Sequence, residues 1–146
     1  RKEMYEELKE QIKEHEGFVP KIYKCPLGKR TIGYGHLILD HEQFEEDKEY
    51  TKEQLELVFE KDFEMSLNDA NKILEGKPVN HIARECVIEL VFNIGMPRTK
   101  KFVKMLSALD REDYGEAAFQ IMDSLYARQV PNRANAIATK MRGAKL

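Results

Sequence analysis

The sequence has few cysteines and no long apolar run. Cys25 and Cys86 are its only two thiols, so at most one disulfide can form. No run approaches the about 18 apolar residues of a membrane span, and no signal-peptide pattern opens the chain. We therefore expect the given chain to be soluble, although a leader or anchor could precede Arg1.

Motifs for cofactors are missing as well. The four histidines show no metal-ligand spacing with the two cysteines. Neither a Walker-type loop nor a dinucleotide-binding fingerprint occurs. We therefore expect no metal and no cofactor.

Charge is abundant but unevenly spread. The net charge is −2, yet residues 1–65 hold 11 Lys and Arg against 17 Asp and Glu, whereas residues 66–146 hold 13 against 9. This asymmetry suggests two lobes. No basic stripe interleaved with aromatic residues appears, so the charges indicate solvated helix faces and not a nucleic-acid partner.

The length of 146 residues and the 42% hydrophobic content suit one compact domain. Thr51 and Gln54 form a capping box that opens a helix of about 23 residues, spanning about 35 Å and able to join two lobes. The run from Glu42 to Glu49 predicts an exposed loop or a short helix. Apolar periodicity predicts other helices over 3–15, 82–94, 101–109, 117–126 and 134–141. Strands are confined near one end, which predicts a predominantly helical α+β fold.

Residues 14–36, EHEGFVPKIYKCPLGKRTIGYGH, form the organising stretch. Gly17 and Pro20 end a helix directly after Glu16. Two runs rich in β-branched and aromatic residues, 22–25 and 31–34, flank a Gly-containing connection and predict a hairpin. We expect Cys25 to pair with Thr31 across this hairpin, which would put an acid, a thiol and a hydroxyl together.

The spacing of these residues resembles a known family. Glu16, Cys25 and Thr31, followed by the run TIGYGH, match the Glu–Asp/Cys–Thr pattern of the phage-type, T4-like lysozymes, or endolysins. The segments VFNIG at 91–95 and QVPNRA at 129–134 are similar to two segments of the same family's C-terminal lobe. Order and spacing agree over nearly the whole chain.

The resemblance implies a single two-lobed lysozyme domain over residues 1–146. The small β-containing lobe would cover about 16–50, the connecting helix about 51–75, and the helical lobe 76–146 with the N-terminal helix. The enzyme would be a muramidase that cuts the β-1,4 bond between N-acetylmuramic acid and N-acetylglucosamine in peptidoglycan. Glu16 would be the general acid, its pKa raised if it is partly buried, and Thr31 would hold the attacking water.

Cys25 stands where T4-like members have an aspartate, and two roles are open for it. In the first, which we favour, it orients water or stabilises charge, and the anomeric configuration inverts. In the second it is a nucleophile and the configuration is retained. Two other functions remain as alternatives. One is a cysteine peptidase that uses Cys25 with His36, and the other is a wall-binding module without catalytic activity. His36 points away from Cys25 if strand alternation holds, which favours a structural histidine paired with an acid.

The resemblance also implies sugar-groove residues: Leu37 beside the hairpin, and Phe92 and Asn93 in the other lobe. Arg133 is similar to a family arginine that reaches across to the catalytic glutamate. The implied partner is the peptidoglycan glycan strand, and we expect a monomer. The protein would be made in the host cytoplasm and act on the cell wall or periplasm, and an export or anchor segment could precede the given chain.

Overall fold

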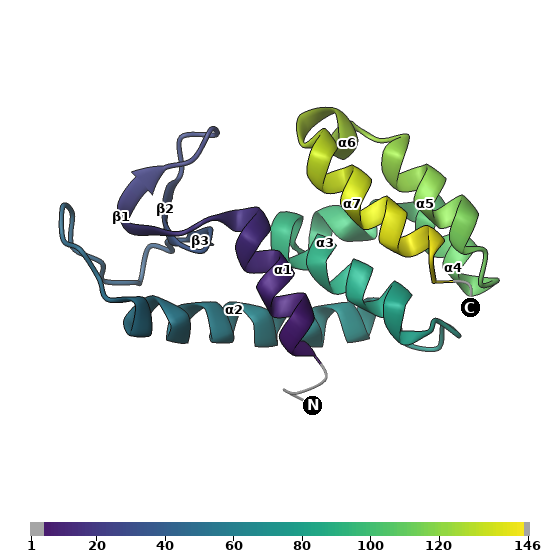
Figure 1. Cartoon of the computed structure of the whole chain (residues 1–146), viewed down its shortest axis with the longest axis horizontal. Helices are drawn as coiled ribbons and strands as arrows, with labels where there is room; N and C mark the ends of the chain where they lie inside the picture. Colours follow the sequence, from purple (N-terminus) through teal and green to yellow (C-terminus); the bar gives the residue numbers. More distant parts are fainter. Residues whose placement is uncertain (1–4, 145–146) are drawn as a thin grey trace. The chain divides into compact units, whose positions relative to one another are not determined.

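The computed structural model describes residues 5–144, so the first residues of the helix predicted over 3–15 lie outside the described part. Contacts divide the chain into two compact units, Arg1–Glu64 and Met65–Leu146. The boundary falls inside the long helix α2 (Lys52–Ile73), which is the teal helix of Figure 1. The three-part division into 16–50, 51–75 and the remainder stays a prediction. The contacts group the N-terminal helix with the sheet, because that helix packs on the first half of α2.

The first unit contains one helix before a small sheet. Helix α1 (Glu6–Glu16) leads into strands β1 (Val19–Lys24), β2 (Arg30–Gly33) and β3 (His36–Leu37). The strands form an antiparallel sheet in the order β1-β2-β3. The predicted hairpin is confirmed, and β3 adds a short third strand to it. Beyond β3, the acidic run before Tyr50 is a loop without a helix.

The capping box at the start of α2 is confirmed. The backbone N–H of Gln54 donates to the Thr51 hydroxyl, and the backbone N–H of Thr51 donates to the Gln54 side chain. The helix has 22 residues, close to the length predicted. Its chain then turns at Gly76, whose φ is 79°. The sequence therefore specified the start and the approximate length of this helix.

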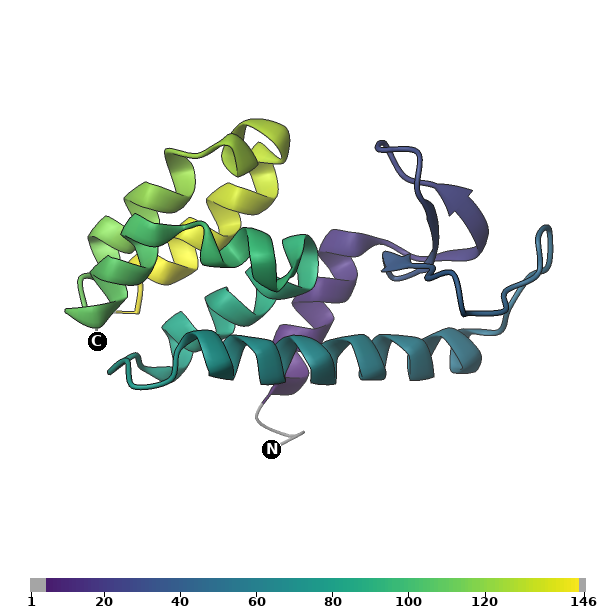
Figure 2. The ribbon, with the colours of Figure 1, turned by 180° about the vertical axis from the view of Figure 1, so that it is seen from behind.

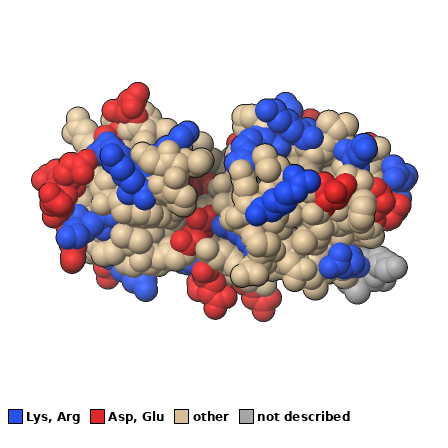
Figure 3. Space-filling view, turned by 90° about the horizontal axis from the view of Figure 1, so that it is seen from above, with Lys and Arg blue, Asp and Glu red and all other residues tan. Residues whose placement is uncertain are grey.

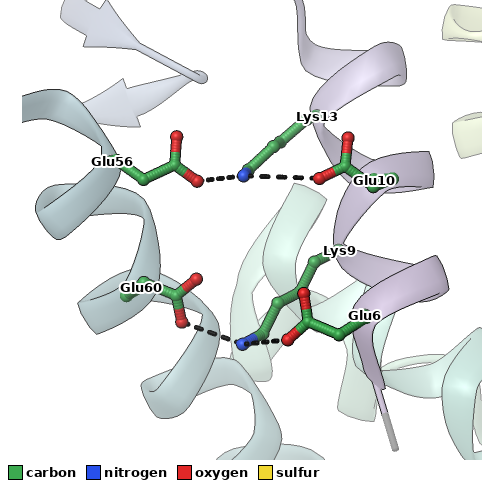
Figure 4. Close-up of polar contacts among 6 residues, drawn as sticks. All are labelled: Glu6, Lys9, Glu10, Lys13, Glu56 and Glu60. Carbon is green, nitrogen blue, oxygen red and sulfur yellow. Dashed lines mark hydrogen bonds and ion pairs between the residues drawn. The ribbon is translucent and has the colours of Figure 1, made fainter. Parts of the chain in front are cut away.

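Helices α1 and α2 pack through an apolar seam and an ionic ladder beside it. Leu8 and Ile12 of α1 are buried, as are Leu55 and Phe59 of α2. Burying side chains of this size stabilises the folded state by roughly 1.5–3 kcal/mol each. The ladder is shown in Figure 4, where each lysine of α1 lies between a glutamate of its own helix and a glutamate of α2. Its members are Glu6, Lys9, Glu10, Lys13, Glu56 and Glu60.

The second unit contains a helical bundle, seen from behind in Figure 2. Helix α3 (His81–Lys100) is interrupted at Gly95, where φ is 86° and ψ is 162°, so the predicted stop at Gly95 is confirmed. Its buried side chains include Ala83, Cys86, Val87, Ile88, Leu90 and Val91. The remaining helices are α4 (Val103–Asp110), α5 (Tyr114–Met122), α6 (Leu125–Gln129) and α7 (Pro131–Arg142).

One helix expected in this unit is two. The predicted helix over 117–126 ends at Met122, and a new helix begins after Ser124. The Ser124 hydroxyl accepts from the backbone N–H of Ala127 and caps α6. The serine therefore begins a new helix, although the continuous apolar periodicity predicted a single one. Pro131 is the first residue of α7, a position that suits proline because its missing N–H has no partner to lose there.

The surface and the cysteines agree with the composition. Acidic and basic side chains are interspersed on the face in Figure 3, as expected of solvated helix faces. Both cysteines are free thiols. Cys86 is buried, and burial raises its pKa to about 12. Among the residues described, none of the helices is long and apolar enough to cross a membrane.

Candidate active site

Glu16 is the last residue of α1 and is half-buried. The helix ends there because Gly17 takes φ 76°, and the Gly17 N–H donates to the carbonyl of Lys13 at 2.9 Å. The Glu16 side chain packs against Gly35 in the turn between β2 and β3. The acid predicted from the sequence is therefore held at a helix end beside the sheet.

The hairpin register differs from the expectation. Tyr23, and not Cys25, pairs with Thr31, and Lys24 pairs with Arg30. The Cys25 N–H donates to the Lys29 carbonyl at 2.9 Å, which continues the ladder by one step. The predicted pairing of Cys25 with Thr31 is therefore wrong. Because directly opposite and alternate residues share a face of the sheet, Cys25 lies diagonally from Thr31 on the same face.

The connecting loop explains the shift. The Gly28 N–H donates to the Cys25 carbonyl at 2.7 Å, and Gly28 has φ 79°. Pro26, Leu27 and Gly28 thus make a three-residue loop with glycine in the left-handed position, where a longer connection through Arg30 was predicted. A Pro-x-Gly sequence is itself a signal for a tight turn, so this register was available from the sequence.

Electrostatics at Cys25 favour the thiolate. The largest effect comes from the backbone N–H of Lys29, which lowers the pKa of the Cys25 thiol; burial opposes it, and the Leu27 N–H and the Thr31 hydroxyl add to the lowering. A donor favours the charged form because it stabilises the negative sulfur. A lowered pKa increases the fraction of the thiol that is ionised at a given pH.

Thr31 is buried, and its hydroxyl donates to the Lys29 carbonyl at 2.9 Å. A hydroxyl has one proton and two acceptor lone pairs. Its proton can therefore serve either the Lys29 carbonyl or the Cys25 sulfur at a given moment, while a lone pair remains to accept. Thr31 can thus link the turn, the thiol and a bound water.

Tyr23 is a site residue that the sequence argument missed. Burial raises the pKa of its phenol, and the negative charges of Glu16 and Cys25 raise it further. Both groups thus lie within electrostatic range of Tyr23, which keeps its proton. The signal that would have found it is the three-residue loop, because that loop places Tyr23 opposite Thr31.

His36 is confirmed as a structural histidine paired with acids. Its Nδ1 lies 2.7 Å from Oδ2 of Asp62, and its Nε2 lies 2.9 Å from both carboxylate oxygens of Glu42. Burial alone lowers the pKa of His36, but the hydrogen bonds and charges of Asp62 and Glu42 outweigh burial and raise it. Both ring nitrogens are therefore engaged with carboxylates, which does not suit a base for Cys25.

The predicted sugar-groove residues divide between the two units. Leu37 is exposed on β3 of the first unit, whereas Phe92 and Asn93 are half-buried on α3 just before the break at Gly95. In the second unit, Nε of Arg133 donates to Oε2 of Glu89 at 3.0 Å, with both side chains largely buried. The predicted pair between Arg133 and Glu16 stays a prediction.

The described part of the chain contains no ligand set for a metal ion. Within residues 5–144, no group of three or more His, Cys, Asp or Glu side chains is placed to hold a metal ion. The residues assigned to the site supply a carboxyl group, a thiol, a hydroxyl and a phenol.

A half-buried carboxyl group at a helix end, beside a small sheet that carries an ionisable thiol, suits a hydrolase that uses acid catalysis. The chain belongs to the phage lysozyme family, whose model, described as "Phage lysozyme", matches residues 13–136. It is thus a lysozyme, a glycoside hydrolase of the type that degrades cell walls.

Named relatives agree with this membership. The chain is similar to "Probable T4-type lysozyme 1" of Dictyostelium discoideum, with 27% identity over 92% of both chains. It is also similar to "Probable T4-type lysozyme 2" of the same organism, at 26% identity. An "Endolysin" of Acyrthosiphon pisum secondary endosymbiont phage 1 is 31% identical over 76% of this chain and 72% of its own length.

Proposed function

We propose that this lysozyme is an endolysin-type muramidase that hydrolyses the β-1,4 bond between N-acetylmuramic acid and N-acetylglucosamine in peptidoglycan. Glu16 protonates the leaving oxygen, and Cys25 and Thr31 act on the attacking water. The observation that carries the proposal is the position of Glu16, half-buried at the end of α1 against Gly35, in a chain that matches the phage lysozyme family. Cleavage of a glycosidic bond needs such an acid on one side and a water or nucleophile on the other.

The environment of Cys25 supports its assignment to the water. The donors that lower the pKa of this thiol favour the charge that a carboxylate would carry in its place. A sulfur that accepts hydrogen bonds from the turn can, like a carboxylate, hold a water and balance positive charge without forming a bond to the sugar. We therefore assign Cys25 to charge stabilisation and water orientation, with inversion at the anomeric carbon. NMR of the freshly released sugar tests this, because initial α-product supports inversion and initial β-product supports a covalent thioglycoside.

Four further residues are assigned to the glycan strand. Leu37 supplies an exposed apolar surface on β3, and the amide of Asn93 suits the acetamido groups of the sugars. Phe92 adds an apolar surface next to Asn93 on α3. Arg133, already paired with Glu89, supplies a fixed positive charge. The enzyme acts on the cell wall as a monomer.

The test is clearance of purified peptidoglycan with analysis of the new chain ends. Wild type and Cys25→Asp should release reducing ends, whereas Glu16→Gln should release none. Glu14→Gln is the matched control, because Glu14 is an exposed carboxylate on the same helix. New free amines in place of reducing ends would indicate a peptidase. Binding to the wall without release of fragments would indicate a wall-binding module.

A further inference from the structure

Gly35 is in direct contact with the side chain of Glu16. A Cβ atom built on Gly35 would lie 2.9 Å from Cδ of Glu16 and closer still to Oε1. The carboxyl group of Glu16 thus occupies the space that any other residue at position 35 would fill. The Cα of Gly35, which carries no side chain, is therefore in contact with the Glu16 carboxyl group.

Gly35 differs in this respect from the other glycines. Gly17, Gly28 and Gly76 also have positive φ, but nothing lies within 4 Å of a Cβ added to them. At Gly33 the neighbour is the apolar side chain of Leu55, 3.4 Å away. Among the eight glycines, Gly35 alone has a carboxyl group at the position of its absent Cβ. The need for glycine there has two sources, a φ of 73° and the presence of Glu16.

The position of Gly35 is fixed by contacts of the residues on both sides of it. Ile32 pairs with His36 across β2 and β3, so the ladder holds the residues flanking Gly35. Tyr34 is buried, with its ring centroid 5.5 Å from that of Phe59 on α2. His36 is bound to Asp62 on the same helix. Because these contacts hold both neighbours of Gly35, its Cα has little freedom to move away from Glu16.

We propose that Gly35 is a positioning residue, which sets the direction of the Glu16 carboxyl by contact and without a polar side chain of its own. The inference rests on the proposed role of Glu16 as the general acid. A methyl group at position 35 displaces the carboxyl on the scale of about 1 Å, and misplacement of that size costs on the order of 10²-fold in rate. Substrate contacts elsewhere are untouched, so the loss falls on kcat while KM stays within about twofold.

The test compares Gly35→Ala with Gly76→Ala. Both positions have positive φ, 73° and 79°, so both variants bear the backbone strain, but only the first meets Glu16. We expect Gly35→Ala to lose about 10- to 100-fold in kcat at unchanged KM, and Gly76→Ala to keep wild-type kcat. Equal kcat in the two variants would overturn the proposal.

A second measurement does not depend on activity. The ¹³C chemical shift of the Glu16 carboxyl carbon should move in Gly35→Ala and stay unchanged in Gly76→Ala; no movement in either would overturn the proposal. If Gly35→Ala fails to fold, D-alanine is introduced at position 35 by ligation at Cys25 and Cys86. D-Alanine favours positive φ and carries its methyl in place of the other Cα hydrogen, not in the space that the Glu16 carboxyl occupies. We expect this protein to keep the wild-type kcat and Glu16 shift, and loss of both would overturn the proposal.

Glu16→Gln, assayed in parallel, separates the two proposals. If Glu16→Gln keeps activity, the acid role fails, while the carboxyl shift still tests the contact with Gly35. If Glu16→Gln is inactive and Gly35→Ala has the kcat of Gly76→Ala, the acid role stands and the positioning role fails.

Discussion

Tyr23 stands opposite Thr31 across the β1–β2 hairpin, with Cys25 one diagonal step away on the same face. Cys25 therefore lies next to the loop and not in the middle of the hydrogen-bonded pairing of β1 with β2. The backbone N–H groups of Leu27 and Lys29 act on its sulfur as hydrogen-bond donors and lower the pKa of the thiol. The register thus determines the chemistry of the thiol.

The first prediction concerns the reactivity of this thiol. Because the pKa of Cys25 is lowered and that of Cys86 is raised to about 12, folded protein at pH 7 should be alkylated at Cys25 more than about tenfold faster than at Cys86. The alkylation midpoint should lie below that of free cysteine. Rates measured by mass spectrometry across pH check this, with unfolded protein as the reference in which the two thiols react alike.

Thr31→Val isolates the hydroxyl's share in the same assay. Valine keeps the branched shape of threonine but removes the donor, so the midpoint for Cys25 should move to higher pH. The shift should be partial, because the Lys29 N–H, the largest contribution, remains. An unchanged midpoint in Thr31→Val would remove the hydroxyl from the thiol's environment.

The sequence was sufficient for the elements that local chemistry controls. The Thr51 capping box, the stop after Glu16 and the break at Gly95 each depend on a few adjacent residues, and the structure contains all three. The acid partners of His36 were expected in kind but not in identity. Asp62 lies 26 residues further along the chain, and only the packing of α2 on the sheet brings it to the imidazole.

The register of the hairpin failed for a different reason. Sliding one strand changes which residues pair without changing the pattern of β-branched and aromatic residues, so composition cannot fix it. The loop length decides it, and the Pro-Leu-Gly loop was shorter than predicted. Tyr23 was missed for the same reason. Ser124 was missed because the apolar spacing of α5 continues into α6 and conceals the cap between them.

The second prediction concerns pH and His36. The pKa of folded His36 is raised, so its charged contacts stabilise the protein fully below the unfolded value near 6.5, and this stability is lost as pH rises through the folded pKa. The pKa of Glu42 is lowered despite burial, through the Leu39 N–H and His36, so its contribution is lost as pH falls through that value. The stability that this cluster contributes is therefore greatest at pH values between the pKa of Glu42 and the pKa of His36.

Asp62→Asn tests the cluster. We expect it to lower the free energy of unfolding by about 1–3 kcal/mol near pH 6, because it weakens a charged hydrogen bond to a largely buried imidazole. The loss should shrink above the pKa of His36, where the neutral ring gains less from a carboxylate. Urea denaturation from pH 4 to 9 measures it, and Asp69→Asn, an isosteric change on the same helix, is the control. A loss that does not vary with pH would contradict this account.

The third prediction concerns the ladder of Figure 4. Lys13 is paired with Glu56, and its ammonium lies 4.9 Å from the ring centroid of Phe59. Lys13→Met keeps the aliphatic stem and removes the charge, so Glu56 loses its lysine partner while apolar packing is retained. We expect a loss of about 1–2 kcal/mol in the free energy of unfolding, because Glu56 is partly exposed and water can compensate.

A double-variant cycle with Glu56→Gln separates the pair from its surroundings. The two single losses should sum to more than the loss of the double variant, because each single change removes the same contact between Lys13 and Glu56. Lys61→Met is the control, since Lys61 lies on α2 outside this ladder. Additive losses would mean that the two side chains are independent despite their contact.

The fourth prediction concerns the pair between Glu89 and Arg133, whose side chains are 4% and 9% exposed. Burying two charges costs desolvation that their mutual contact helps to offset, so removing one partner is worse than removing both. Glu89→Gln should lower the free energy of unfolding by about 3–5 kcal/mol, because it leaves the guanidinium with weakened compensation in a buried place. Glu89→Met combined with Arg133→Met should cost less than Glu89→Gln alone.

Thermal and urea unfolding measure the difference, with Glu85→Gln, whose partner is Lys140, as the matched control on the same helix. If the double variant is the less stable of the two, Arg133 contributes to folding mainly through packing of its stem, and the ion pair is secondary.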